Sequence, residues 1–156
     1  MGAGAVGGYF GGLLANQGED VVLIARGAHG DAIAKNGLQV DSHWGSFNVK
    51  VDVTDDPSTV GEVDLILHCI KLYSNAESFP TMKGMIGENT NILTIQNGAT
   101  AGQILGEVVG HCHVLEDVLV FTALLIVEIL IGFMLISSQD NESFPKTYVV
   151  FCFQIH

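Results

Sequence analysis

The sequence has few basic residues, and this shortage excludes one class of partner. Its 6 Lys and Arg stand against 17 Asp and Glu, which gives a formal net charge of −11. Nucleic-acid binding needs a basic stripe that displaces counterions from the phosphate backbone, and a few scattered cations cannot supply one. We therefore predict no nucleic-acid partner. A dinucleotide remains compatible with this charge, because a helix N-terminus and one or two cations can hold a pyrophosphate.

Cysteine is also scarce. The 3 cysteines are an odd number and form no CxxC pair, so we interpret them as reduced thiols of a cytoplasmic protein. No basic region followed by an apolar run and a cleavage site marks a signal peptide at the N-terminus. His111, Cys112 and His113 lie together, but their spacing fits no standard zinc pattern, and we predict no metal site.

Apolar residues are abundant and fall into short runs, which predicts buried strands. The β-branched run Val21–Ile24 is typical of a strand that is buried on both faces. Similar strands are expected at 63–70, at 91–95 and from 113 towards 120. Leu38–Val40 and Phe47–Val51 alternate polar with apolar residues around Gly45, which predicts a half-exposed hairpin.

Helical patterns lie between these runs. Val6, Phe10, Leu13 and Leu14 have helical spacing, and Gly18 is the expected C-cap. Further helices are expected through 32–33, after Asp56-Pro57, over 75–86, and through 104–108. Strands that alternate with helices predict a parallel sheet covered on both faces. The predicted fold class is α/β, a Rossmann-type doubly wound parallel sheet.

The first residues match the G-x-G-x-x-G fingerprint of dinucleotide-binding domains. The first glycine permits the tight turn, the second lets the backbone approach the pyrophosphate, and the third allows close helix packing. The helix that follows directs its first amides, and the positive end of its dipole, at the phosphates. The residues predicted to bind the pyrophosphate are Gly2, Ala3, Gly4, Ala5, Val6 and Gly7.

Arg26 lies at the end of the second expected strand of such a fold, about 20 residues beyond the fingerprint. An acidic residue there would hydrogen-bond the ribose 2′-hydroxyl and select NAD, whereas a guanidinium suits the 2′-phosphate. We predict that Arg26 binds NADP(H); the alternative is a solvated arginine in a loop. A strand should precede the fingerprint, and Met1 stands one residue before the first glycine. We therefore expect an N-terminally truncated domain that lacks its first, central strand.

Three segments in order, GAGAVGGYFGGLLA, VDLILHCIK and ILTIQNG, show that the sequence resembles the ketopantoate reductase (2-dehydropantoate 2-reductase) family. The resemblance runs from Gly2 to about Ala123. It implies an NADP-binding Rossmann domain over 1–123, which family members follow with a helical domain. It also implies the NADPH-dependent reduction of a 2-oxoacid such as 2-dehydropantoate, in pantothenate biosynthesis, in a cleft between the domains.

The resemblance also implies roles for two further residues. Lys71 would lie near the cofactor at the end of its strand. Asn97 would lie beside the nicotinamide and hydrogen-bond substrate or ribose. Both have simpler alternatives, since Asn97-Gly98 is a common turn dipeptide and Lys71 could be a surface cation. The predicted catalytic residues are Asn97 and Lys71, and both are also predicted to contact NADP(H).

The family's proton donor, a lysine in the helical domain supported by a glutamate, has no counterpart here, since Lys146 lies in no matching context. The helical domain is thus expected to be absent, and the chain alone is predicted to have no substantial reductase activity. Residues 124–156 form a divergent apolar tail with no assigned domain. Val118–Ile136 approaches the length of a membrane span, but Glu128 interrupts it and no basic residue flanks it, so we favour unselected sequence over an anchor.

Three alternatives stay open. The chain could be a non-catalytic NADP(H)-binding module, or it could be tethered to a membrane through 118–136. It could also share the fingerprint with other 2-hydroxyacid or opine dehydrogenases, although Asn97 and Lys71 favour the ketopantoate type. The oligomeric state is undetermined by the sequence, and a homo-oligomer is compatible with it.

Overall fold

The computed structural model describes residues 5–43, 45–96, 101–110, 114–116 and 147–151. Within these residues six parallel strands form one sheet in the order β4-β1-β8-β5-β6-β7. Its strands are β1 (Asp20–Ile24), β4 (Asp52–Thr54), β5 (Val63–His68), β6 (Ile86–Thr94), β7 (Val114–Glu116) and β8 (Thr147–Phe151). The predicted α/β class is confirmed.

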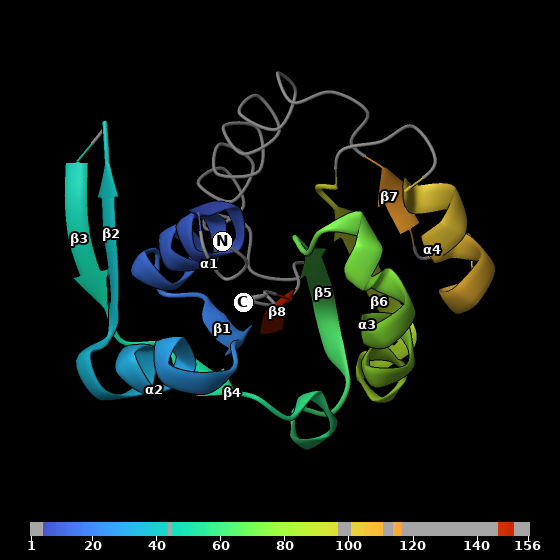
Figure 1. The fold of residues 1–156 in the computed structure, drawn as a ribbon, viewed down its shortest axis with the longest axis horizontal. Coiled ribbons are helices and arrows are strands. Elements are labelled where there is room, and N and C mark those ends of the chain that lie inside the picture. Colours follow the sequence, from blue (N-terminus) through green and yellow to red (C-terminus); the bar gives the residue numbers. More distant parts are fainter. Residues whose placement is uncertain (1–4, 44, 97–100, 111–113, 117–146, 152–156) are drawn as a thin grey trace, which may run out of the picture.

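Helices connect these strands, as the sequence predicts. The described helices are α1 (Ala5–Asn16), α2 (Gly27–Asn36), α3 (Asn75–Met82) and α4 (Ala101–Val109), with short 3-10 turns η1 (Pro57–Thr59), η2 (Leu72–Ser74) and η3 (Lys83–Met85). The predicted hairpin is also present as β2 (Leu38–Ser42) and β3 (Gly45–Val49), paired antiparallel. It stands beside α1 and α2, apart from the main sheet (Figure 1).

Strand β1 is buried on both faces, and its successive residues enter different cores. Leu23 of β1 packs with Phe10 of α1 and with the hairpin on one face of the sheet. Ile24, the next residue, packs with Phe79 and Met82 of α3 on the other face. This two-sided burial explains why the strands read as continuous apolar runs in the sequence.

Close packing and a helix cap account for two of the glycines near the N-terminus. A Cβ on Gly12 would lie 2.8 Å from Cγ2 of Val40, so only glycine lets α1 approach the hairpin this closely. Gly18 has φ +94, and its amide donates to Ala15 while the amide of Glu19 donates to Leu14. These bonds end α1 with a Schellman motif at the predicted C-cap.

The centre of the sheet differs from the expectation. Among the described residues no strand precedes α1, and β8, from the tail that was predicted to carry no assigned domain, occupies the central place. Its backbone pairs with β1 on one edge and with β5 on the other, so Val149 lies opposite both Val22 and Ile66. The expected loss of a shared neighbour between these strands therefore does not occur. The predicted apolar segment at 118–136 lies outside the described residues.

The sequence also gave no indication of β4, because its three residues follow the predicted hairpin without a turn signal. The structure ends the hairpin at Val49 and pairs Asp52–Thr54 with β1 at the sheet edge.

In the described part of the chain, no helix is long and apolar enough to cross a membrane.

If β8 is the central strand, a proline within it must disrupt the sheet. Val149→Pro removes an amide hydrogen from a strand that is paired on both edges and leaves a neighbouring carbonyl unsatisfied. We expect the free energy of unfolding to fall by about 2 kcal/mol or more, measured by urea denaturation. Val149→Ile keeps the amide and should stay close to the unsubstituted chain. Equal stability of the two variants would contradict the placement of β8.

Candidate functional site

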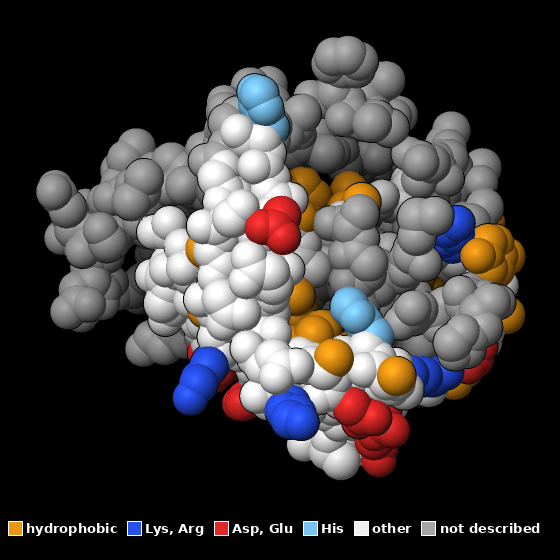
Figure 2. Space-filling view, turned by 60° about the vertical axis from the view of Figure 1, so that its left-hand side comes forward, with side chains coloured by type: hydrophobic (Ala, Val, Ile, Leu, Met, Phe, Trp, Pro, Cys, Tyr) orange, Lys and Arg blue, Asp and Glu red, His pale blue; other side chains and the backbone are white. Residues whose placement is uncertain are grey.

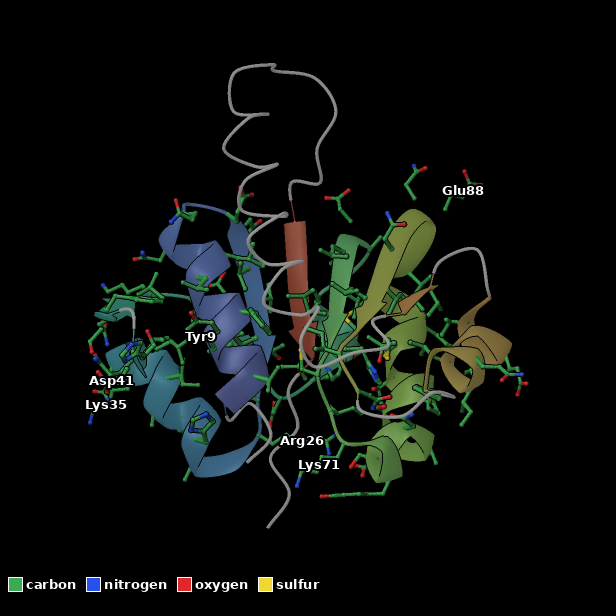
Figure 3. All side chains as sticks on the ribbon, turned by 90° about the horizontal axis from the view of Figure 1, so that it is seen from above. Tyr9, Arg26, Lys35, Asp41, Lys71 and Glu88 are labelled. Atoms are coloured by element: carbon green, nitrogen blue, oxygen red, sulfur yellow. The ribbon has the colours of Figure 1, made fainter. Side chains whose placement is uncertain are left out.

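The candidate site lies at the carboxyl ends of the parallel strands, where doubly wound sheets bind their ligands. Arg26 follows β1, Lys71 follows β5, and Gln96 follows β6. Figure 3 shows the arrow of β8 pointing towards the end of the sheet at which Arg26 and Lys71 lie. The topology therefore brings to one edge residues that are widely separated in the sequence.

Helix α1 begins at Ala5, so the fingerprint enters it as the sequence predicts. No acidic residue lies in its first turn, which leaves the positive end of the helix dipole without a neutralising side chain of its own. Val6 is 45% exposed, whereas Gly7 is buried where the helix packs on the sheet. Gly2, Ala3 and Gly4 lie outside the described residues.

Arg26 is the N-cap residue of α2, with extended backbone, and its side chain is partly exposed. Its guanidinium Nη1 donates to Oε1 of Glu77 at 2.6 Å, across the carboxyl end of the sheet. Glu77 lies in the first turn of α3, and no sequence pattern predicts it as the partner of Arg26. A guanidinium held here can meet a phosphate or a carboxylate with paired, charge-assisted hydrogen bonds.

Lys71 is exposed directly after β5, and its Nζ lies 6.0 Å from the centre of the Tyr73 ring. Its carbonyl accepts a hydrogen bond from the amide of Ser74 at 2.9 Å, which turns the chain into η2. Tyr73 is 68% exposed, so a cation and an aromatic face lie together in solvent at this edge. Asn97, the other predicted catalytic residue, lies outside the described residues.

A buried amide pair, which sequence reasoning missed, ties the ends of β5 and β6 together. Asn75 Nδ2 donates to Gln96 Oε1 at 3.1 Å, and Gln96 Nε2 donates to Asn75 Oδ1 at 2.6 Å. Gln96 Nε2 also donates to the carbonyl of Ile70 at 2.7 Å. Both side chains are buried, so the pair fixes the chain on either side of Lys71 and immediately before Asn97. The only signal in the sequence was a polar residue directly after a buried strand.

Two titratable groups at the end of β5 are held neutral by burial. Burial lowers the pKa of His68 to about 4, and its ring lies against Phe79 at 5.6 Å between centroids. Burial also raises the pKa of the Cys69 thiol to about 12, so this thiol is poorly nucleophilic at neutral pH. Neither group is placed for acid–base chemistry in the solvent-facing site; both belong to the packing beneath it.

Two open hollows in the described part of the chain lie away from this edge. One hollow near α2, about 400 Å³, is lined at the amino end of β1 by residues of both charges, including Glu19, Asp20, Lys35 and Lys50. Another hollow lies at the amino ends of β5 and β6 around Glu62 and Glu88. On the face that Figure 2 shows, basic side chains lie among acidic ones and form no basic strip. We base the site on strand topology and not on these hollows.

No cluster of three or more His, Cys, Asp or Glu side chains that could hold a metal ion occurs among the described residues. His111, Cys112 and His113, which the sequence brought to attention, lie outside them. Cys69 is a free thiol.

A parallel doubly wound sheet, a helix that begins within the glycine-rich fingerprint of the sequence, and an arginine after the next strand together define the class as a Rossmann-type domain. The comparison with known families then gives the particular one. The family described as Ketopantoate reductase PanE/ApbA matches residues 1–126, and the chain belongs to this family.

Named relatives agree with this assignment. The chain is 42% identical to 2-dehydropantoate 2-reductase of Pyrococcus horikoshii over 99 residues, covering 63% of this chain and 32% of that protein. The 2-dehydropantoate 2-reductase structure from Geobacter metallireducens matches with TM-score 0.69 at 36% identity, over 74% of this chain and 38% of that one. D-mandelate dehydrogenase, solved with NADH and anilino(oxo)acetate, matches with TM-score 0.67 at 25% identity, over 75% of this chain and 38% of that one. The chain thus spans about a third of the length of these relatives.

Burial of neutral His68 makes stability depend on pH. The unfolded chain binds a proton at this group near pH 6.5 and the folded chain only near pH 4. The contribution of neutral His68 to the free energy of unfolding is therefore complete above pH 6.5. It is lost as the pH falls from 6.5 towards 4, and the free energy of unfolding decreases by up to about 3 kcal/mol. Urea denaturation of the chain and of His68→Leu at pH 7 and pH 4.5 measures this. His68→Leu should show the smaller loss; an equal loss in both would assign it to other groups.

Proposed function

We propose that this chain is the cofactor domain of an NADPH-dependent reductase that converts a 2-oxoacid, 2-dehydropantoate, into its 2-hydroxyacid, pantoate. The observation that carries the proposal is the position of Arg26 at the carboxyl end of β1, the strand that follows the fingerprint helix. Membership of the ketopantoate reductase family supports the reaction class. The reaction of the whole protein is part of the proposal, because the match covers only 32% of the Pyrococcus horikoshii relative that carries that name.

The described residues fit NADP(H) better than NAD(H). An Asp or Glu at the end of β1 would accept a hydrogen bond from a ribose 2′-hydroxyl, but Ile24 is followed by Ala25 and Arg26. A guanidinium binds a 2′-phosphate with two parallel charge-assisted hydrogen bonds. In this proposal the fingerprint Gly2, Ala3, Gly4, Ala5, Val6 and Gly7 lies against the pyrophosphate, with the N-terminus of α1 facing the phosphates.

Lys71 and Asn97 complete the proposed site near the nicotinamide. When bound, NADPH supplies the hydride that reduces the ketone. The ketone oxygen gains negative charge as it is reduced, and this charge needs a cation or a proton donor. Lys71 brings positive charge to the correct edge, but it is exposed to solvent and stands over Tyr73. We propose that it positions cofactor and substrate, and that the proton donor belongs to the helical domain that family resemblance implies.

A non-catalytic NADP(H)-binding module is the second candidate. It is favoured by the same geometry, because Arg26 and Lys71, the described cations at the carboxyl ends, are solvent-accessible. A dry site is what strengthens charge stabilisation during hydride transfer. The two candidates differ in turnover and not in cofactor binding.

Arg26→Ala tests the cofactor assignment. Removal of a charge-assisted pair of hydrogen bonds should cost about 1.5 to 3 kcal/mol, which weakens NADPH binding by about ten- to a hundredfold and leaves NADH binding nearly unchanged. Titrations of the full chain followed by cofactor fluorescence measure both. Lys35→Ala removes the same charge in the hollow beside the amino end of β1 and serves as the control. Equal loss of NADPH and NADH affinity on Arg26→Ala would contradict a 2′-phosphate contact.

Turnover separates the two candidates. The purified chain with 2-dehydropantoate should oxidise NADPH at no more than the background rate, measured by the loss of NADPH absorbance. This outcome follows from the open edge of the site, which offers no water-excluded donor among the described residues. A matched assay with a full-length relative such as the Pyrococcus horikoshii enzyme confirms that the substrate is competent. Steady turnover by this chain, abolished by Lys71→Ala, would instead make Lys71 the catalytic cation.

A further inference from the structure

The ion pair between Arg26 and Glu77 spans the place where β8 ends. Arg26 comes from the β1 side of the sheet and Glu77 from α3, which follows β5. β8 lies between β1 and β5. The pair, at 2.6 Å, therefore bridges the β1 side and the β5 side of the sheet.

Glu77 is held at this position by its helix. It lies in the first turn of α3, where the helix dipole favours a negative charge. The helix begins at Asn75, whose side chain is buried and paired with Gln96, and Ser78 Oγ donates to the carbonyl of Asn75 at 3.2 Å. Glu77 itself is 68% exposed. A carboxylate is thus presented to solvent from a fixed backbone, within hydrogen-bonding distance of the proposed phosphate-binding arginine.

We propose that Glu77 is a specificity-determining residue, which competes with the 2′-phosphate of NADP(H) for Arg26. This inference rests on the proposed function, because it needs Arg26 to face that phosphate. A carboxylate and a phosphate use the same N–H groups of a guanidinium, so the ion pair must loosen when the phosphate binds. The Glu77 carboxylate and a phosphate bound to the same guanidinium also repel each other. NAD(H) has no 2′-phosphate and leaves the pair intact, so Glu77 reduces the preference for NADP(H) that Arg26 alone would give.

The expected size of the effect follows from the exposure of the pair. Exposed ion pairs are weak, so the competing interaction should lower NADPH affinity by about two- to fivefold and not abolish it. Glu77→Gln keeps the size of the side chain, removes its charge, and should raise NADPH affinity by that factor. NADH affinity should stay unchanged. The gain should shrink at high salt, since screening weakens the competing charge.

The experiment uses the full chain with Glu77→Gln, Arg26→Ala and a matched control, Glu88→Gln. Glu88 is also an exposed glutamate, so its substitution changes the net charge equally, but it lies at the opposite end of the sheet (Figure 3). Each variant is titrated with NADPH and with NADH by fluorescence. Adenosine 2′,5′-bisphosphate and 5′-AMP, titrated by calorimetry, report the same phosphate without the nicotinamide. Circular dichroism confirms that each variant is folded.

The possible outcomes distinguish the proposed role of Glu77 from the proposed cofactor assignment on which it rests. A two- to fivefold gain for NADPH and for the bisphosphate in Glu77→Gln, with no gain in Glu88→Gln, supports it. Unchanged or weaker NADPH binding in Glu77→Gln overturns it, while a loss of NADPH preference in Arg26→Ala would still uphold the cofactor assignment. If Arg26→Ala keeps the preference for NADPH over NADH, or if the unsubstituted chain binds neither cofactor, both the cofactor assignment and the proposed role of Glu77 are contradicted.

Discussion

The central strand is the constraint on which the rest of the structure depends. β8 is hydrogen-bonded along both edges, and these two ladders join the β4–β1 half of the sheet to the β5–β6–β7 half. Neighbouring strands lie about 4.8 Å apart, so β8 sets β1 and β5 at about twice that spacing. An arginine that follows β1 can reach a glutamate on the helix after β5 only at such a spacing. The position of the guanidinium therefore depends on a segment far away in the sequence.

The same topology divides the molecule into two ends with different chemistry. At the carboxyl ends, the hydrogen bonds between the Asn75 and Gln96 side chains hold the backbone that carries the polar and charged groups. His68 and Cys69 lie beneath these side chains, and burial keeps both of them neutral. At the amino ends, one hollow is lined by charged side chains of both signs, and the charged side chains of the other are all acidic. Only the carboxyl end combines a helix N-terminus with an oriented guanidinium, which is what a dinucleotide phosphate requires.

Local pattern predicted the elements whose partners lie nearby in the chain. β1, β5 and the hairpin follow from apolar runs and alternation, and the Gly18 cap follows from its position after a helical pattern. β8 did not follow, because Thr147–Phe151 is apolar and β-branched but nothing in it specifies which strand edges it joins. Arg26 was predicted as a binding residue from its distance to the fingerprint. Its partner Glu77 was not predicted, because a contact between residues 51 positions apart produces no periodic sequence pattern. The sequence thus predicted the parts of the fold that depend on local contacts, but it did not predict which side chains contact each other within the site.

The acidic composition of the chain and its proposed preference for an extra phosphate are compatible because they act over different distances. The net charge of −11 opposes the approach of any polyanion, but this long-range term acts nearly equally on NADPH and NADH and is screened beyond about 10 Å. Discrimination between them is a difference between two affinities, so only groups within reach of the 2′ position contribute to it. In the proposed site, Arg26 adds to this difference and Glu77 subtracts from it. In this proposal the cofactor preference is adjusted through a carboxylate on α3, without a change in the arginine or the fingerprint.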